Sequence, residues 1–143
     1  MSKSIITKLS MIALVVLLVN GCLGPLSKGP SDEKLIDSTM TEWEAAHQAK
    51  DLDRIMATFS ENYVSWRGGG KQEMREFIAR GIDEGFMDNV EVKTENAEIN
   101  IEADKSTYGP VEFTGERGTF GLNYKLQKEN GKWLIIGAER PEQ

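Results

Sequence analysis

The spacing of apolar residues changes once along this chain, near residue 89. Before that point apolar residues recur at every third or fourth position, and after it they alternate with polar residues. A helix buries one face with the first period, and a strand buries one face with the second. Helices followed by strands predict an α+β domain in which a curved antiparallel sheet wraps around three N-terminal helices.

Three amphipathic helices are expected in the first part. Ser31 can cap the first and Asp51 the second, because each side-chain oxygen can accept an unpaired backbone N–H. The third is expected to begin near Lys71, after a short strand over residues 63–66. The buried stripes of the three helices are, in order, Ile36, Met40, Trp43 and His47; Leu52, Ile55, Met56 and Phe59; and Met74, Phe77, Ile78 and Ile82.

The inward face of the sheet is expected to switch sides near residue 95. Val90 and Val92 occupy even positions, whereas Ile99 and Ile101 occupy odd ones. One extra residue between them, a β-bulge, would restore the common facing and bend the strand. We therefore expect a sheet that curls over the helices and leaves a cavity at its wide end.

Turn signals divide the rest of the β region. Residues 115–118 (GERG) and 128–131 (KENG) predict two turns, and the second contains the Asn-Gly pair typical of a tight hairpin. Residues 133–138 are apolar on both faces, which predicts a strand in the centre of the sheet.

The first 21 residues have the organisation of an export signal. Lys3 and Lys8 precede an apolar run over residues 9–19 that is too short to span a bilayer core of about 30 Å. The following LVNGC, ending at Cys22, resembles the bacterial lipobox. That resemblance implies that Cys22 is acylated and becomes the new N-terminus; the alternative is an exported protein with a free thiol.

These features divide the chain into a lipoprotein signal peptide (1–21), a lipidated cysteine with a flexible tether (22–31) and one folded domain (32–140). The expected location is the bacterial cell envelope, anchored to a membrane by the lipid on Cys22. In a host with two membranes, Leu23 favours the periplasmic side of the outer membrane.

Composition excludes several classes of function. The net charge is −6, and it becomes −8 once the two leader lysines are removed, which argues against a nucleic-acid partner. One cysteine and one histidine cannot form an internal disulfide or a Cys/His zinc site within one chain. We expect neither a metal nor a cofactor.

Three segments resemble the nuclear transport factor 2-like superfamily, also described as SnoaL-like or cystatin-like. They are WEAAHQAKDLDRIMATF (43–59), GKQEMREF (70–77) and LQKENGKWLI (126–135). The resemblance implies the cone fold but no single function, because the superfamily contains both enzymes and proteins without known chemistry. Trp43 and Arg67 stand where its ketosteroid isomerases have a tyrosine donor and an aspartate base, which argues against that reaction.

Several residues are candidates for a site inside the cone. Trp43, Tyr63, Trp66 and Tyr124 can line a pocket for a flat apolar ligand or simply fill the cone. His47, the only histidine, can act as a general base there or be structural. Glu112 and Arg117 can pair with a ligand or remain solvated.

Two main hypotheses follow. The first is a lipid-anchored extracytoplasmic domain that binds a small apolar ligand or a partner protein without catalysis. The second is a cyclase, hydratase or hydrolase in which His47 is the base. A homodimer formed through the outer face of the sheet is compatible with the first.

Overall fold

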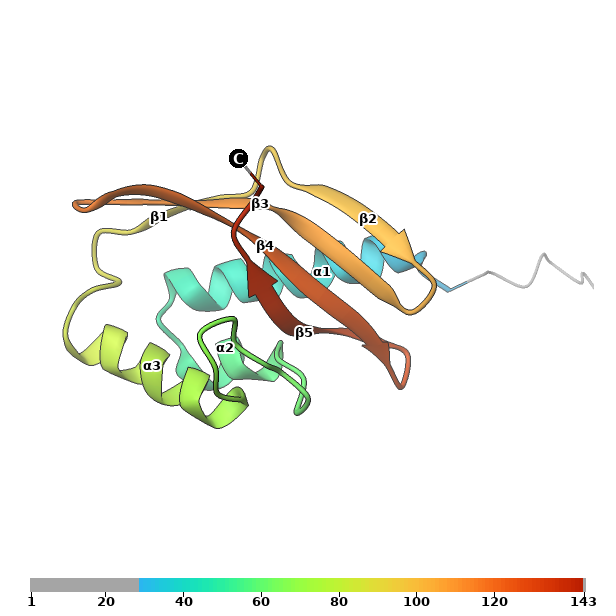
Figure 1. Ribbon diagram of the computed structural model, residues 1–143, viewed down its shortest axis with the longest axis horizontal. Helices are drawn as coiled ribbons and strands as arrows, with labels where there is room; N and C mark the ends of the chain where they lie inside the picture. Colours follow the sequence, from blue (N-terminus) through green and yellow to red (C-terminus); the bar gives the residue numbers. More distant parts are fainter. Residues whose placement is uncertain (1–28, 143) are drawn as a thin grey trace, which may run out of the picture.

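The computed structural model describes residues 29–142, which fold into three helices and one antiparallel sheet (Figure 1). The expected α+β architecture is confirmed: the sheet curves over the long first helix. The predicted signal peptide, Cys22 and most of the tether lie outside the described residues. No helix within 29–142 is long and apolar enough to cross a membrane. The elements are α1 (Asp32–Gln48), α2 (Leu52–Ala57), α3 (Lys71–Asp83), β1 (Glu91–Lys93), β2 (Glu98–Glu102), β3 (Lys105–Gly115), β4 (Gly118–Glu129) and β5 (Lys132–Glu139).

The predicted helix caps are confirmed. The Ser31 hydroxyl accepts the Lys34 N–H at 3.4 Å, and the Asp51 carboxylate accepts the Arg54 N–H at 3.1 Å. Both caps satisfy a backbone donor that the first helical turn leaves unpaired.

The buried face of α3 is narrower than predicted. Ile78 is buried and Met74 and Ile82 are half-buried, whereas Phe77 is 57% exposed. The assignment of Phe77 to the buried side was wrong, because α3 packs mainly against the short α2 and a single i, i+4, i+8 row is enough for that contact.

The predicted switch of the inward face near residue 95 is confirmed, but the prediction that a single β-bulge produces it was wrong. Val92 pairs with Phe113 and Ile99 with Tyr108, all on the inward face. Between these pairs, residues 94–97 form a turn opposite only two residues of β3.

The chain is divided into β1 and β2 at this point because β3 itself bends. The pairing of β3 with β4 shifts between Tyr108 and Val111, so that Gly109 and Pro110 lie opposite the single residue Asn123. A bulge of this kind curves the strand. The chain that pairs with β3 on its other side must follow this bend and also change its own inward face. The turn over residues 94–97, between β1 and β2, allows both.

The strand β5 lies at the end of the order β1-β3-β4-β5, so its predicted central position was wrong. Its outer edge is instead covered by residues 58–64, the covering segment. The Ser60 N–H donates to the Ile135 carbonyl at 2.9 Å, and the Val64 N–H donates to the Ile136 carbonyl at 3.0 Å. The covering segment makes only isolated contacts of this kind, and residues 63–66 do not form the predicted strand.

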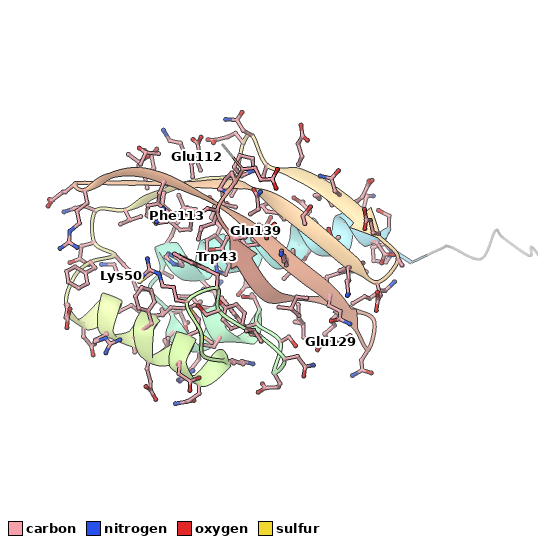
Figure 2. The ribbon with its side chains drawn as sticks, viewed as in Figure 1. Trp43, Lys50, Glu112, Phe113, Glu129 and Glu139 are labelled. Carbon is pink, nitrogen blue, oxygen red and sulfur yellow. The ribbon has the colours of Figure 1, made fainter. Side chains whose placement is uncertain are left out.

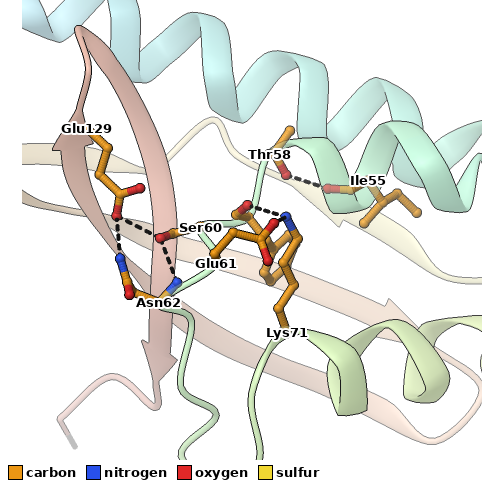
Figure 3. Close-up of polar contacts among 8 residues, drawn as sticks. Ile55, Thr58, Ser60, Glu61, Asn62, Lys71 and Glu129 are labelled. Atoms are coloured by element: carbon orange, nitrogen blue, oxygen red, sulfur yellow. Dashed lines mark hydrogen bonds and ion pairs between the residues drawn. The ribbon is translucent and has the colours of Figure 1, made fainter.

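Buried and exposed polar contacts fix the covering segment on both sides (Figure 3). The fully buried Ser60 hydroxyl donates to the Glu129 carboxylate at 2.6 Å and accepts the Asn62 N–H at 2.9 Å. On the other side the Lys71 ammonium donates to the Phe59 carbonyl at 2.9 Å and to Glu61 at 2.6 Å. These groups connect the covering segment to the end of β4 and the start of α3, so they are structural.

The close approach of β3 and β4 at the bulge gives a test of the fold. A Cβ on Gly109 would lie 2.9 Å from the Asn123 Cα and 3.0 Å from the Leu122 carbonyl oxygen, both backbone atoms. We expect Gly109→Ala to lower the free energy of unfolding by about 2 kcal/mol or more, the usual cost of overpacking. Gly29→Ala is the matched control, because nothing lies within 4 Å of its added Cβ. Equal urea midpoints for the two variants would contradict this account of the bend.

Candidate functional site

Four of the five residues predicted to line an internal pocket meet inside the cone, where they fill it. Trp43, Tyr63 and Tyr124 are nearly inaccessible, and His47 is largely buried beside them. The Trp43 ring centre lies 5.0 Å from those of His47 and Tyr124 and 6.0 Å from that of Phe113. Figure 2 shows Trp43 and Phe113 under the curved sheet. These rings form the core of the domain.

The environment of His47 is aromatic. Its ring lies beside those of both Trp43 and Phe113, with centre distances of 5.0 and 6.2 Å. Burial lowers the pKa of the imidazole from its ordinary value of 6.5 to about 4, because the charged form loses hydration that nothing replaces. His47 is therefore neutral at pH 7, and its basicity is close to that of a carboxylate.

Burial also raises the pKa of the Tyr63 and Tyr124 hydroxyls, and the proximity of the two hydroxyls raises that of Tyr124 further. Both phenols therefore remain protonated at neutral pH. They supply the core with neutral polar groups and not with acids or bases that act near pH 7.

An open hollow of about 430 Å³ lies at the wide end of the cone, between the loop that follows α3 and the β3–β4 hairpin. We call it the mouth hollow. In Figure 1 this end of the molecule is on the left. The residues that line it are Gly85, Phe86, Asn89, Val90, Phe113, Gly115, Glu116, Arg117, Gly118, Thr119 and Phe120.

The walls of the mouth hollow are aromatic. The Phe113 and Phe120 rings are stacked, with centres 4.9 Å apart and an interplanar angle of 8°. Phe113 is buried and belongs to the core, whereas Phe120 and Phe86 are 55% and 56% exposed. The mouth hollow is thus a continuation of the core surface that no part of residues 29–142 covers.

Polar groups cross the mouth hollow from one wall to the other. The Arg117 guanidinium lies 5.2 Å from the centre of the Phe86 ring, and Asn89 donates to the Glu116 carboxylate at 3.4 Å. Both contacts join the hairpin to the loop after α3. An ion pair between Lys50 and Asp88 holds the same loop to the end of α1. The arrangement gives a largely apolar space with one cation and one anion at its rim.

A second hollow, of about 420 Å³, lies between α1 and the β4–β5 hairpin. The Thr39 hydroxyl donates to the Trp133 carbonyl beside it at 2.9 Å, and the Trp133 indole N–H donates to Asp32 at 2.9 Å. None of the predicted site residues lines this hollow. Its lining is Leu35, Ser38, Thr39, Glu42, Ala57, Thr58, Gly131, Lys132, Trp133 and Leu134.

The fifth predicted pocket residue, Trp66, lies on the surface and is 50% exposed. The Arg67 and Arg140 guanidinium carbons lie 4.6 and 5.5 Å from the centre of its ring. Arg67, which stands where ketosteroid isomerases have their base, is thus on the surface, whereas Trp43 is in the core.

The sequence analysis identified neither Phe86 nor Phe120 as a site residue. Arg117 was recognised as a possible ligand partner. The available signal was the predicted Gly115–Gly118 turn, which places Arg117 and Phe120 together at one end of the sheet.

Solved structures establish the fold to which this arrangement belongs. A protein of unknown function from Nostoc punctiforme, described as having a cystatin-like fold, is similar with a TM-score of 0.60 and 21% identity over 76% of this chain and 89% of its own. The protein has the cystatin-like fold. Two nuclear transport factor 2-like proteins of unknown function also share it. The one from Shewanella oneidensis has a TM-score of 0.56 and 15% identity over 76% of this chain and 97% of its own. The one from Shewanella baltica has a TM-score of 0.58 and 15% identity over 78% and 94%.

The resemblance predicted to the nuclear transport factor 2-like superfamily is therefore confirmed at the level of the fold. At these identities the cystatin-like fold carries no statement about activity. No protein-family model and no curated protein matches the sequence.

The neutral state of His47 can be measured directly, because its imidazole is the only one in the chain. We expect its NMR signals to titrate near pH 4 in the folded protein and near pH 6.5 in urea. The unfolded chain then binds more protons between these values, so stability falls as the pH drops from about 6.5 to about 4. His47 contributes up to about 3 kcal/mol to that loss. His47→Gln should lose correspondingly less stability over this interval, and a folded-state titration above pH 6 would contradict the burial.

Proposed function

We propose that this protein is a lipid-anchored protein of the bacterial cell envelope that binds a small apolar ligand in the mouth hollow without transforming it. The observation that carries the proposal is an open space of about 430 Å³ between Phe86 and Phe120, each more than half exposed. Ligand sites of this kind have volumes of about 300–1,000 Å³ and are lined mainly by apolar and aromatic groups.

The aromatic walls provide the free energy of binding. Full burial of a phenylalanine side chain contributes about 1.5–3 kcal/mol, and Phe86 and Phe120 still have more than half of that surface to cover. The stacked face of Phe113 and Phe120 favours a ligand with a flat apolar part, since aromatic groups pack against such a face at close range.

The polar rim provides orientation. Arg117 already lies over the Phe86 ring, and the Asn89–Glu116 hydrogen bond also joins the two walls of the mouth hollow. A few polar groups around an apolar space are the usual means by which a site fixes one end of its ligand.

Binding without catalysis is favoured by the position of His47. Its ring lies beside that of Phe113 and is not part of the lining of the mouth hollow, and a pKa of about 4 makes its imidazole a weak base. An enzyme that uses His47 as its base is the alternative. If the protein converts a ligand to a product and His47→Gln abolishes that activity, the result would favour the alternative.

Anchoring on Cys22 completes the proposal. The lipobox-like LVNGC supports acylation of Cys22, and the Gly-, Pro- and Ser-rich tether that follows would hold the domain within roughly 15–18 Å of the bilayer. The membrane is then the permanent partner of this protein, and the apolar ligand is its exchangeable one.

The mouth hollow can be tested with N-phenyl-1-naphthylamine, a neutral apolar molecule that fluoresces when it leaves water. We expect the purified protein to bind it. Phe86→Ala and Phe120→Ala should each raise the Kd about tenfold, because each removes one apolar wall worth more than 1 kcal/mol.

Phe77→Ala is the matched control, since Phe77 is equally exposed, at 57%, but lies on α3 outside the lining. It should leave the Kd unchanged. An equal loss of affinity in all three variants, or none in any, would contradict binding in the mouth hollow. Native mass spectrometry of protein purified from its host membrane would identify any natural ligand that is retained.

Acylation of Cys22 predicts that the wild-type protein is found in the membrane fraction and carries the mass of its acyl chains. Cys22→Ser should move it to the soluble fraction. Ser27→Cys in the Cys22→Ser background restores a thiol outside the lipobox and should not restore membrane attachment. A wild-type protein whose measured mass shows no acyl chains would contradict the lipid anchor.

A further inference from the structure

A second exposed aromatic–cationic cluster of the described residues, around Trp66, contributes to the lining of neither hollow. Trp66 is 50% exposed and Val64 is 65% exposed, whereas the two other tryptophans of the chain, Trp43 and Trp133, are 1% exposed. Exposure of large apolar side chains to water is unfavourable. The exposure of both Val64 and Trp66, two residues apart in the chain, therefore indicates a possible contact surface.

Two arginines from distant parts of the sequence converge on this indole. The guanidinium carbons of Arg67, in the loop between α2 and α3, and Arg140, after β5, lie 4.6 and 5.5 Å from the Trp66 ring centre. Within residues 29–142 neither arginine forms an ion pair, although the domain has an excess of carboxylates. The two positive charges are therefore available to an external anion. We call Val64, Trp66, Arg67 and Arg140 the indole–arginine patch.

A hydrogen-bonded turn holds Trp66 in its exposed position. The Gly68 N–H donates to the Ser65 carbonyl, and the Ser65 N–H donates to the Gly69 carbonyl, both at 2.9 Å. Gly68 and Gly69 have φ angles of +87° and +88°, which other residues adopt only with strain. The exposure of Trp66 thus results from a closed turn, since its backbone is fixed on both sides of the indole.

The other end of this loop is fixed to the sheet. The Val64 N–H donates to the Ile136 carbonyl of β5, four residues before Arg140. Arg67 and Arg140 are therefore presented by two segments that are bonded to each other, and the patch is a preformed surface.

We propose that the indole–arginine patch contacts the phosphate and glycerol layer of the membrane that carries the lipid anchor. This inference rests on the anchoring of Cys22 proposed above. Tryptophan favours the interface between water and hydrocarbon, because its ring is apolar and its N–H is polar. Arginine binds phosphate through two parallel hydrogen bonds while its stem covers apolar surface.

The charge distribution favours a lipid headgroup as the occupant. The domain is acidic overall, so phosphate groups repel most of its surface, and a local pair of unpaired arginines is the feature that complements them. The acyl chains on Cys22 already provide attachment. The patch determines which side of the domain faces the bilayer.

Tryptophan fluorescence of the full, acylated protein tests this contact. The protein is reconstituted into vesicles of phosphatidylethanolamine and phosphatidylglycerol, with or without bromine atoms near the top of the acyl chains, which quench indoles by contact. The emission of Trp66 is obtained as the difference between the wild type and Trp66→Phe. Trp43 and Trp133 are buried and should not respond.

We expect the brominated lipid to remove at least half of the Trp66 emission. The double variant Arg67→Gln, Arg140→Gln should reduce this quenching at least twofold, because it removes the two groups that hold the phosphates. Arg80→Gln is the matched control: it also removes an exposed arginine, but from α3, and should leave the quenching unchanged.

Three results would overturn the proposal, and they can be distinguished from one another. In the first, the brominated lipid does not quench the Trp66 emission of the acylated, vesicle-bound protein, whereas soluble acrylamide does. This would show that the patch faces water. Trp66 protected from both quenchers at a high density of protein, but not at a low one, would show that a second copy or another protein covers it. Unmodified mass at Cys22 would contradict the anchor itself and, with it, this use of the patch.

Discussion

The bend of β3 at Gly109 and Pro110 determines the shape of this protein. It changes the facing of β3, so that Tyr108 before the bend and Phe113 after it both point toward α1. A straight strand would turn one of the two rings outward, because side chains alternate strictly along it. The interruption between β1 and β2 follows the same bend on the neighbouring strand. The cone therefore depends on a few backbone contacts where β3 and β4 approach most closely.

Phe113, which the bend turns inward, belongs to the aromatic packing at the centre of the cone. Its ring lies beside those of Trp43 and His47, and the Trp43 ring also lies beside that of Tyr124, so these four rings form one continuous cluster. The same packing explains why His47 is neutral, since no carboxylate replaces the water that its charged form would need. The open apolar surface is displaced to the wide end, where the β3–β4 hairpin extends past the helices and Phe120 stacks on the last buried ring.

Local signals predicted the local structure well. The capping residues Ser31 and Asp51, the Asn130-Gly131 turn and the change of facing near residue 95 all depend on a few neighbouring residues, and the structure has them. The errors concern contacts between distant segments. Residues 133–138 are apolar on both faces because the covering segment, which precedes them by more than seventy residues, supplies the neighbour that a further strand would have supplied. For the candidate site, sequence identified Arg117 and the core aromatics. It could not distinguish a filled cone from a hollow one, because that depends on the relative positions of α1 and the sheet.

The covering segment also affects how this protein behaves among its own copies. A strand edge with free N–H and C=O groups is a template on which another chain can add. In this domain that edge belongs to the apolar strand β5, and it is shielded by a loop held through Ser60, Glu129 and Lys71. Resistance to self-association along β5 therefore depends on three polar side chains, of which only Glu129 belongs to a strand of the sheet. The solubility of this domain would rely on them as much as its stability relies on the core.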